Sequence, residues 1–156
     1  MKRRVLIAMI LVTLASAAGP KDDGAKLQGT WVCTWVKMGR VAGAAKGEGN
    51  VPVGIRFEGD QYVEFNGKTD SPRGIFRLDP TKTPKQMDLI NDDVLPPLTG
   101  GPKGKTTVPC IYELDGDKLK VRMGGEARPK AFASRRVGEY DAPDTLLVYR
   151  RVKPTR

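Results

Sequence analysis

The chain has no histidine among its 156 residues, and it has only two cysteines. The lack of histidine excludes a Ser-His-Asp triad, a Cys-His dyad and every histidine-ligated metal site. Two cysteines are also too few for a zinc site with four cysteine ligands. We therefore expect no catalytic residues, no metal site, no cofactor and no enzymatic activity. The sequence alone does not say what the protein does.

Long apolar runs are missing too, apart from one near the N-terminus. Residues 5–14 are almost entirely apolar, follow the cations at 2–4 and precede a run of small residues. This is the pattern of a secretory signal peptide, and a run of about ten residues is half the length of a membrane-spanning helix. We predict that residues 1–18 are a leader cleaved after Ala17 or Ala18. The mature protein is then exported, to the periplasm or outside the cell, without a transmembrane segment.

Basic residues outnumber acidic ones by 27 to 18, which gives a formal net charge of +9. Loss of the three cations of the leader lowers this charge to +6. The positive residues are spread along the chain, as is typical of a solvated surface. The alternative interpretation is a weak attraction to an anionic polymer or lipid surface of the cell envelope. We expect no nucleic-acid binding, because no recognition motif accompanies the charge.

Alternation of apolar and polar residues dominates the rest of the chain, and no helical period persists. Turn dipeptides such as Asn66-Gly67 and Asp115-Gly116 separate the alternating segments. Such segments predict eight or nine short antiparallel strands, typical of an all-β up-and-down barrel or a sandwich. The predicted strands are residues 30–36, 53–58, 62–65, 74–78, 87–90, 106–114, 118–123, 131–134 and 145–152.

We favour a barrel of about eight strands, because closure leaves no unpaired strand edge. The chain has no internal repeat or linker, so a single domain is predicted at residues 26–153, after a short polar segment at 19–25. Residues 39–50, rich in Gly and Ala, are predicted to form a loop. Pro109 lies inside a predicted strand and removes one ladder donor there, which indicates an edge or a bulge.

Several segments, taken in order, resemble a known family. They are similar to a family of small exported domains that is expanded in planctomycete bacteria, described as lipocalin-like and without an assigned function. The resemblance covers about residues 26–153 and implies a lipocalin-like antiparallel barrel, export and no catalytic residues to carry over. The segments that carry it are residues 27–31, 58–60, 76–85, 101–106, 111–121, 128–129 and 146–151.

The chain departs from the pattern of this family at two places. Pro109-Cys110 stands where the family commonly has Gly, and Arg122-Met123 stands where it often has Cys. Cys33 and Cys110 both fall on predicted apolar faces, and export makes them a candidate disulfide. The bond would require Cβ atoms about 3.5–4.5 Å apart. The alternative is two buried free thiols.

The apolar faces of the strands predict the lining of the barrel. Gly29-Thr30-Trp31 stands where lipocalins carry a Gly-x-Trp signature, which implies that Trp31 closes one end. Alternation along the strand places Cys33 and Trp35 on the same face as Trp31. A barrel of about eight strands is either filled by side chains or leaves room for one small ligand. The predicted lining is Trp31, Trp35, Ile55, Phe57, Phe65, Phe76, Tyr112, Leu119 and Val121.

Carboxylates are the remaining groups suited to acid–base chemistry. Glu64, Asp88 and Glu113 each lie on a predicted strand, and we expect each of them to point outward. Two hypotheses for function follow. The first is a binding module that holds a small apolar or amphipathic molecule in the barrel. The second is an interaction domain with a filled core, whose basic surface contacts an anionic envelope component or another exported protein. An accessible apolar cavity distinguishes the two.

Overall fold

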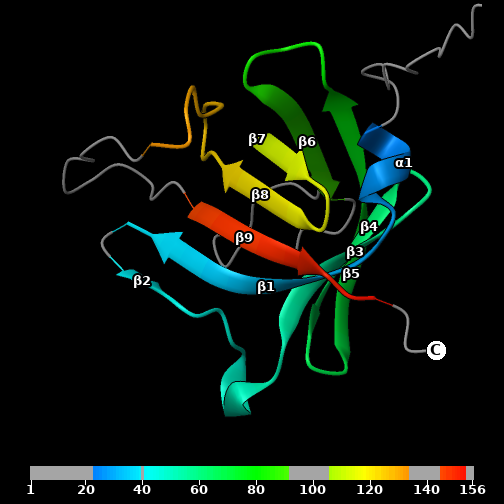
Figure 1. The fold of residues 1–156 in the computed structure, drawn as a ribbon, viewed down its shortest axis with the longest axis vertical. Helices are drawn as coiled ribbons and strands as arrows, with labels where there is room; N and C mark the ends of the chain where they lie inside the picture. Colours follow the sequence, from blue (N-terminus) through cyan, green and yellow to red (C-terminus); the bar gives the residue numbers. More distant parts are fainter. Residues whose placement is uncertain (1–22, 40, 92–105, 134–144, 154–156) are drawn as a thin grey trace, which may run out of the picture.

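A computed structural model describes residues 23–39, 41–91, 106–133 and 145–153 (Figure 1). The predicted leader at residues 1–18 lies outside the described residues. Within them the chain forms nine strands, one short helix and one turn of 3-10 helix. These elements are α1 (Asp23–Leu27), β1 (Gly29–Met38), β2 (Val41–Gly43), η2 (Glu48–Asn50), β3 (Val53–Glu58), β4 (Gln61–Asn66), β5 (Thr69–Asp79), β6 (Lys85–Asn91), β7 (Thr106–Asp115), β8 (Lys118–Met123) and β9 (Thr145–Arg151).

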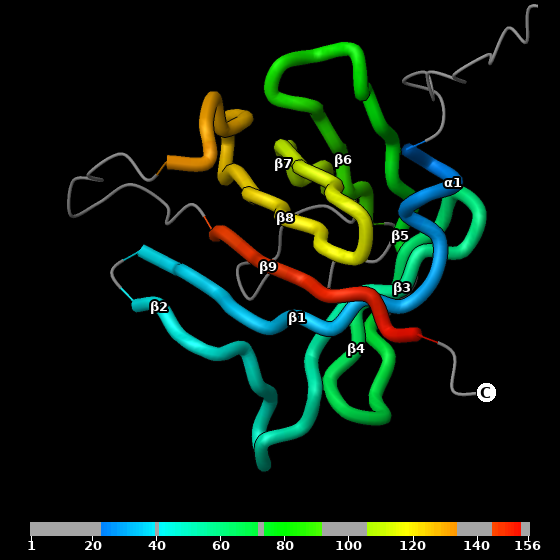
Figure 2. The backbone as a smooth tube through the Cα atoms, in the orientation of Figure 1, coloured from blue at the N-terminus to red at the C-terminus, as the bar shows by residue number. Residues whose placement is uncertain are grey.

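The strands form one closed antiparallel barrel. Each strand from β3 to β8 pairs with the next one along the chain, and β1 pairs with both β3 and β9. Figure 2 shows β1 and β9, from opposite ends of the described chain, running side by side. The three-residue strand β2 pairs only with the end of β1, so eight strands close the ring. The predicted all-β, lipocalin-like barrel of about eight strands is confirmed.

Most strands occupy the predicted positions, and glycines with positive φ turn the chain between them. Gly67 (φ 64°) lies between β4 and β5, and Gly116 (φ 53°) lies between β7 and β8. Glycine adopts this backbone region without the steric penalty that a Cβ atom brings. Pro109 lies one residue beyond the last β7–β8 pair, Cys110–Met123, and its carbonyl accepts a hydrogen bond from Gly124. The backbone N–H group that Pro109 lacks is therefore missing at a position where the neighbouring strand β8 has already ended.

Two sequence predictions about the connections are wrong. The predicted loop at residues 39–50 contains β2 and η2. The predicted strand at 131–134 is not a strand over its described residues, 131–133. The carbonyls of Ala131 and Ala133 accept hydrogen bonds from the Arg122 guanidinium instead of from a neighbouring strand. This short apolar run thus contacts the barrel through the side chains of Arg122 and of Lys120, whose Nζ lies 5.0 Å from the centre of the Phe132 ring, rather than through a ladder.

A bulge in β1 changes which residues face the interior. Cys33 pairs with Tyr149, but the next register pair along β1 is Trp35 with Val148. One extra residue in β1 therefore reverses the alternation beyond Thr34. Tyr149 belongs to the core, so Val148 and its partner Trp35 lie on the outer face. The prediction that Trp35 shares a face with Trp31 and lines the barrel is wrong for this reason.

The helix α1 lies across one end of the barrel, which we call the closed end (Figure 1). Leu27 of α1 and Trp31 of β1 are both fully buried, and the Trp31 indole donates a hydrogen bond of 2.7 Å to the Leu27 carbonyl. Asp23 is buried as well. Part of the segment predicted as a polar lead-in at 19–25 therefore belongs to the packed domain. No helix within the described ranges has the length and apolar character needed to cross a membrane.

Candidate functional site

The two ends of the barrel interior differ in how completely side chains fill them. At the closed end, the inward-facing Trp31, Phe57, Tyr112 and Leu119 are all at most 1% exposed. At the opposite end, which we call the open end, the inward-facing apolar residues are only partly buried. They are Val53, Val108, Met123 and Leu147, and they pack against the same core. Partly buried apolar residues also lie at the closed end, at Leu78 and Leu114, so the most completely buried side chains form a plug there without covering the whole inner wall.

Glu64 of β4 faces the interior, contrary to the prediction that it points outward. Its register partner is Ile55, a core residue that is 3% exposed. Directly opposite residues of antiparallel strands present their side chains to the same face. The core residue Tyr62, two positions away on β4, agrees with this orientation. Glu64 is nevertheless exposed to solvent, so its carboxylate lies on an inner wall that water reaches.

Both faces of β4 carry apolar residues, and for this reason the sequence indicated the wrong face. The apolar Val63 and Phe65 suggested an inward-facing pair, but both lie on the outer face. Phe65 is the register partner of Gly54, and a Cβ atom on Gly54 would lie 2.4 Å from the Phe65 Cζ atom. The Phe65 ring thus covers Gly54 on the outside of the barrel. Phe65 does not line the interior, and Glu64 takes the inward position.

Although water reaches the Glu64 side chain, the surrounding barrel walls partly desolvate its carboxylate, and this burial raises the pKa of Glu64. The pKa values of Tyr62 on β4, Cys110 on β7 and Tyr149 on β9 are raised mainly by burial, and the charge of Glu64 adds to each rise. These three core residues lie on different strands around the ring. A carboxylate close enough to raise the pKa values of all three residues lies inside the barrel. In the described part of the chain, Glu64 has no hydrogen bond and no ion pair.

Two tyrosines add polar groups near Glu64. The Tyr62 hydroxyl donates a hydrogen bond to Oδ1 of Asn91 at the end of β6. Gly74 lies opposite Tyr62, and a Cβ atom there would lie 2.6 Å from the tyrosine ring, so only glycine leaves room for the ring. Tyr149 is 4% exposed, and its hydroxyl has no hydrogen-bond partner among the described residues. Its pKa, raised by burial, keeps it a neutral donor and acceptor.

The remaining predicted lining residues fall in the core. Seven of the nine belong to the buried cluster and face inward: Trp31, Ile55, Phe57, Phe76, Tyr112, Leu119 and Val121. They form the packed core of the barrel. Trp35 and Phe65 are the two exceptions. Asp88 and Glu113 point outward as predicted, where they form ion pairs with Arg128 and Lys120.

Cys33 and Cys110 are both free and buried. Cys33 lies on β1 and Cys110 on β7, and β9 and β8 separate these strands in the wall of the barrel. Because adjacent strands are about 4.8 Å apart, thiols on strands so far apart along the wall do not reach disulfide distance. The candidate disulfide is therefore absent from the structure, and the alternative of two buried thiols describes it. Burial raises the pKa of Cys110 to about 12.

A polar cluster holds α1 on the closed end. Asp23 accepts hydrogen bonds from the Lys85 ammonium (2.7 Å) and from the Tyr112 hydroxyl (2.8 Å). Burial by itself would raise the pKa of Asp23, but these two hydrogen bonds together with the positive charges of Lys85 and Lys26 outweigh burial, and the pKa is lowered. The three groups satisfy one another. We therefore assign them to the packing of α1 and not to binding.

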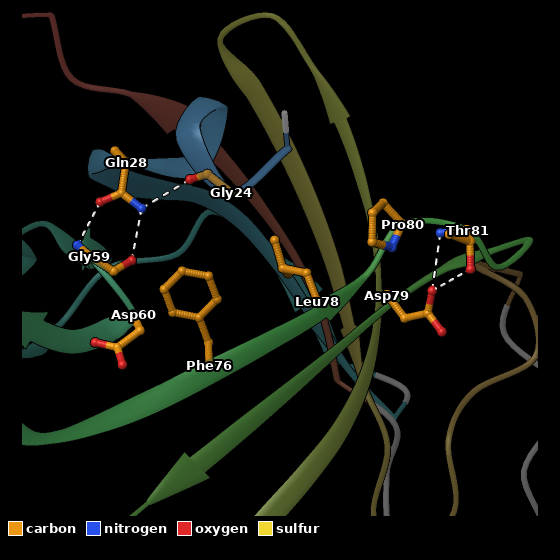
Figure 3. A pocket seen from close by; sticks show the side chains of 9 residues that line it. All are labelled: Gly24, Gln28, Gly59, Asp60, Phe76, Leu78, Asp79, Pro80 and Thr81. Carbon is orange, nitrogen blue, oxygen red and sulfur yellow. Dashed lines mark hydrogen bonds between the residues drawn. The ribbon is translucent and has the colours of Figure 1, made fainter. Parts of the chain in front are cut away.

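A hollow lies on the side of the closed end, between α1 and the β5–β6 connection. It has a volume of about 580 Å³, and Phe76 and Leu78 form its apolar floor (Figure 3). The Gln28 side chain borders it with hydrogen bonds to Gly24 and Gly59. Figure 3 shows Gln28 hydrogen-bonded to Gly24 and Gly59, and Asp79 to Thr81, whereas the Asp60 carboxylate at the rim has no hydrogen bond among the described residues. We favour the open end of the barrel as the candidate site, because its unpartnered carboxylate, Glu64, faces the barrel interior.

No protein-family model, curated protein or solved structure matches this chain. The resemblance to the planctomycete family stays a prediction from the sequence.

Proposed function

We propose that this protein is an exported, lipocalin-like domain that binds one small apolar or amphipathic molecule in the open half of its barrel. The observation that supports the proposal is Glu64, which faces inward and is nevertheless exposed to solvent. In a completely filled barrel, inward side chains away from the two ends have little access to water. The exposure of Glu64 therefore favours the binding module over the interaction domain with a filled core.

The chemistry of the walls favours an apolar ligand body. Around the open end the inner wall is formed by partly buried aliphatic side chains and Met123. Burying such a surface against a ligand is favourable by about 25 cal/mol per Å² of apolar area. A few polar groups among apolar walls are typical of small-molecule sites. Glu64 and the Tyr149 hydroxyl are these groups here.

Native mass spectrometry of the protein, secreted through its own leader into a bacterial periplasm, tests the proposal. Extra mass that survives gentle ionisation and disappears on denaturation would identify a bound molecule. A second assay measures the fluorescence gain of the apolar probe N-phenyl-1-naphthylamine. We expect saturable binding of about one probe per chain. No retained mass and no probe binding would favour the alternative, in which the basic outer surface contacts an anionic envelope component or another exported protein.

A matched pair of variants locates the bound probe. Val108 faces the interior opposite Leu89, whereas its neighbour Thr107 is exposed on the outer face. A larger side chain at the inner position occupies the space that we assign to the ligand. We expect Val108→Phe to weaken probe binding and Thr107→Phe to leave it unchanged. Equal effects of the two substitutions would place the probe outside the barrel.

A further inference from the structure

Glu64 is a negative charge on the inner wall, and no cation among the described residues pairs with it. The described cations next to the interior are used elsewhere: Lys85 pairs with Asp23, and Arg151 pairs with Asp117 and lies over the Trp31 ring. All of these lie at the closed end. Across the described residues, no ion pair includes Glu64. The open half of the interior therefore carries one unpaired carboxylate among apolar walls.

We propose that the ligand carries a protonated amine, and that Glu64 binds this amine while the apolar body of the ligand lies against Val53, Val108, Met123 and Leu147. This inference rests on the proposed binding function and specifies its ligand class, a cationic amphiphile. The second polar contact is the hydroxyl of Tyr149, a core residue that is 4% exposed and has no hydrogen-bond partner in the described chain.

The chemistry of an ionised carboxylate explains the preference. A carboxylate only accepts hydrogen bonds, and a protonated amine only donates them. Partial removal of Glu64 from water costs free energy that a bound cation offsets. A ligand carboxylate would instead place two negative charges in one small interior. An alcohol of equal chain length offers a hydrogen-bond donor without a charge. Its affinity is expected to lie between those of the amine and the carboxylate.

Three ligands with the same alkyl chain test the inference: decylammonium, decanol and decanoate, each kept below its critical micelle concentration. Their affinities are measured at about pH 8, where carboxylates are ionised, by displacement of N-phenyl-1-naphthylamine. A charge-assisted hydrogen bond corresponds to roughly 10- to 100-fold in affinity. We expect decylammonium to bind more tightly than decanoate by at least roughly this factor.

Glu64→Gln keeps the shape of the side chain and removes its charge. We expect this substitution to abolish the preference for the amine over decanol and decanoate. Glu113→Gln is the matched control, because Glu113 lies on a strand but points outward, where it pairs with Lys120. The control should retain the full preference. Retention of the preference in Glu64→Gln would overturn the assignment of Glu64.

The pH dependence of the unmodified protein gives a second test that requires no variant. The titratable groups that interact with Glu64 are Tyr62, Cys110 and Tyr149, and their raised pKa values keep them neutral between about pH 5 and pH 8. Protonation of Glu64, whose pKa is raised by burial, is thus the change expected near the site as the pH is lowered. We expect the affinity for decylammonium, but not for decanol, to fall as the pH approaches the pKa of Glu64.

The outcomes separate this inference from the proposed function. Binding of decanol without any preference for decylammonium, or tighter binding of decanoate, would overturn the amine assignment and leave the binding module standing. No binding of any of the three ligands would overturn both. A preference for the amine that disappears in Glu64→Gln and in acid would support both.

Discussion

The Cζ atom of Arg151, near the end of the last strand, lies 4.1 Å from the centre of the Trp31 ring in the first strand. The same guanidinium donates hydrogen bonds to the backbone carbonyls of Gln28 and Lys26 and to the carboxylate of Asp117. One cation thus joins β1, β9 and the chain after α1. This contact completes the barrel at its closed end, where the two ends of the described chain meet.

Replacing this arginine therefore weakens closure of the barrel. Arg151→Lys keeps the charge but loses the planar group that stacks on Trp31 and reaches several acceptors. We expect a loss of about 1–3 kcal/mol in the free energy of unfolding, measured by urea denaturation. Arg150→Lys is the control, because Arg150 is the exposed neighbour on the outer face. Equal losses in the two variants would contradict the role of the stacked cation.

Glu64 should cost the fold stability at neutral pH. Burial raises its pKa in the folded state above the ordinary value of 4.5. The folded state then disfavours the ionised form, so stability is lost as the pH rises through the folded-state pKa. We expect Glu64→Gln to unfold at a higher urea concentration than the unmodified protein at about pH 7. The difference should shrink in acid, where both side chains are neutral. A less stable variant at neutral pH would show that Glu64 has a structural role instead.

Asp23 should have the opposite pH dependence. Its pKa is lowered from the ordinary value of 3.8, so its contribution is complete above that value and is lost as the pH falls through the folded-state pKa. Asp23→Asn removes the ion pair with Lys85 and weakens the contact with Tyr112, and we expect a loss of about 1–3 kcal/mol at neutral pH. The loss should become smaller in strong acid. Asp60→Asn, at an exposed turn position, serves as the control and should unfold like the unmodified protein.

Gly54 tests the placement of Phe65 on the outer face. A Cβ atom at this position would lie 2.2 Å from the Trp31 carbonyl oxygen and 2.4 Å from the Phe65 ring. We expect Gly54→Ala to destabilise the protein by about 1–3 kcal/mol, because the backbone of β1 cannot move aside without breaking the ladder. Gly43 also lies in a strand but has nothing within 4 Å of its Cβ position. Gly43→Ala should therefore be tolerated, and similar thermal unfolding of the two variants would refute the close approach at Gly54.

The two tryptophans should respond differently to a quencher in solution. Trp31 is fully buried, whereas Trp35 lies on the outer face and is partly exposed. Acrylamide quenching of the Trp31→Phe variant, which keeps only Trp35, should exceed that of the Trp35→Phe variant. Urea-unfolded samples supply the reference in which both tryptophans are accessible. Equal protection of the two in the folded protein would mean that the bulge in β1 does not turn Trp35 outward.

Local pattern predicted the strands well where one face is apolar and the other is charged. The strand β8 is the clearest case, since Leu119, Val121 and Met123 alternate with three cations and the apolar set faces inward. The turn at Asp115-Gly116 was also predictable, because glycine tolerates the positive φ that the turn requires. These features depend on near neighbours in the chain. The number and regular spacing of such strands are typical of a barrel or a sandwich, and the pairing of β1 with β9 closes the barrel.

The candidate site was less predictable, because it depends on register. On β4, Val63 and Phe65 lie on one face, and Tyr62 and Glu64 lie on the other. No signal within this strand shows which of the two faces points inward. Pairing with β3 resolves this ambiguity, since Glu64 lies opposite Ile55. A signal for the correct face was present in Gly54, a strand glycine that leaves room for an outer ring.

Composition and short-range alternation were enough to predict the all-β fold class, the positions of most strands and the absence of histidine chemistry. The outward orientation of Trp35 and the inward orientation of Glu64 depend instead on contacts between strands. A bulge of one residue reverses every side chain beyond it, and the pairing of neighbouring strands selects the face that is buried. The one unpaired carboxylate found on the described inner wall therefore became visible only when the strands were paired into a closed barrel.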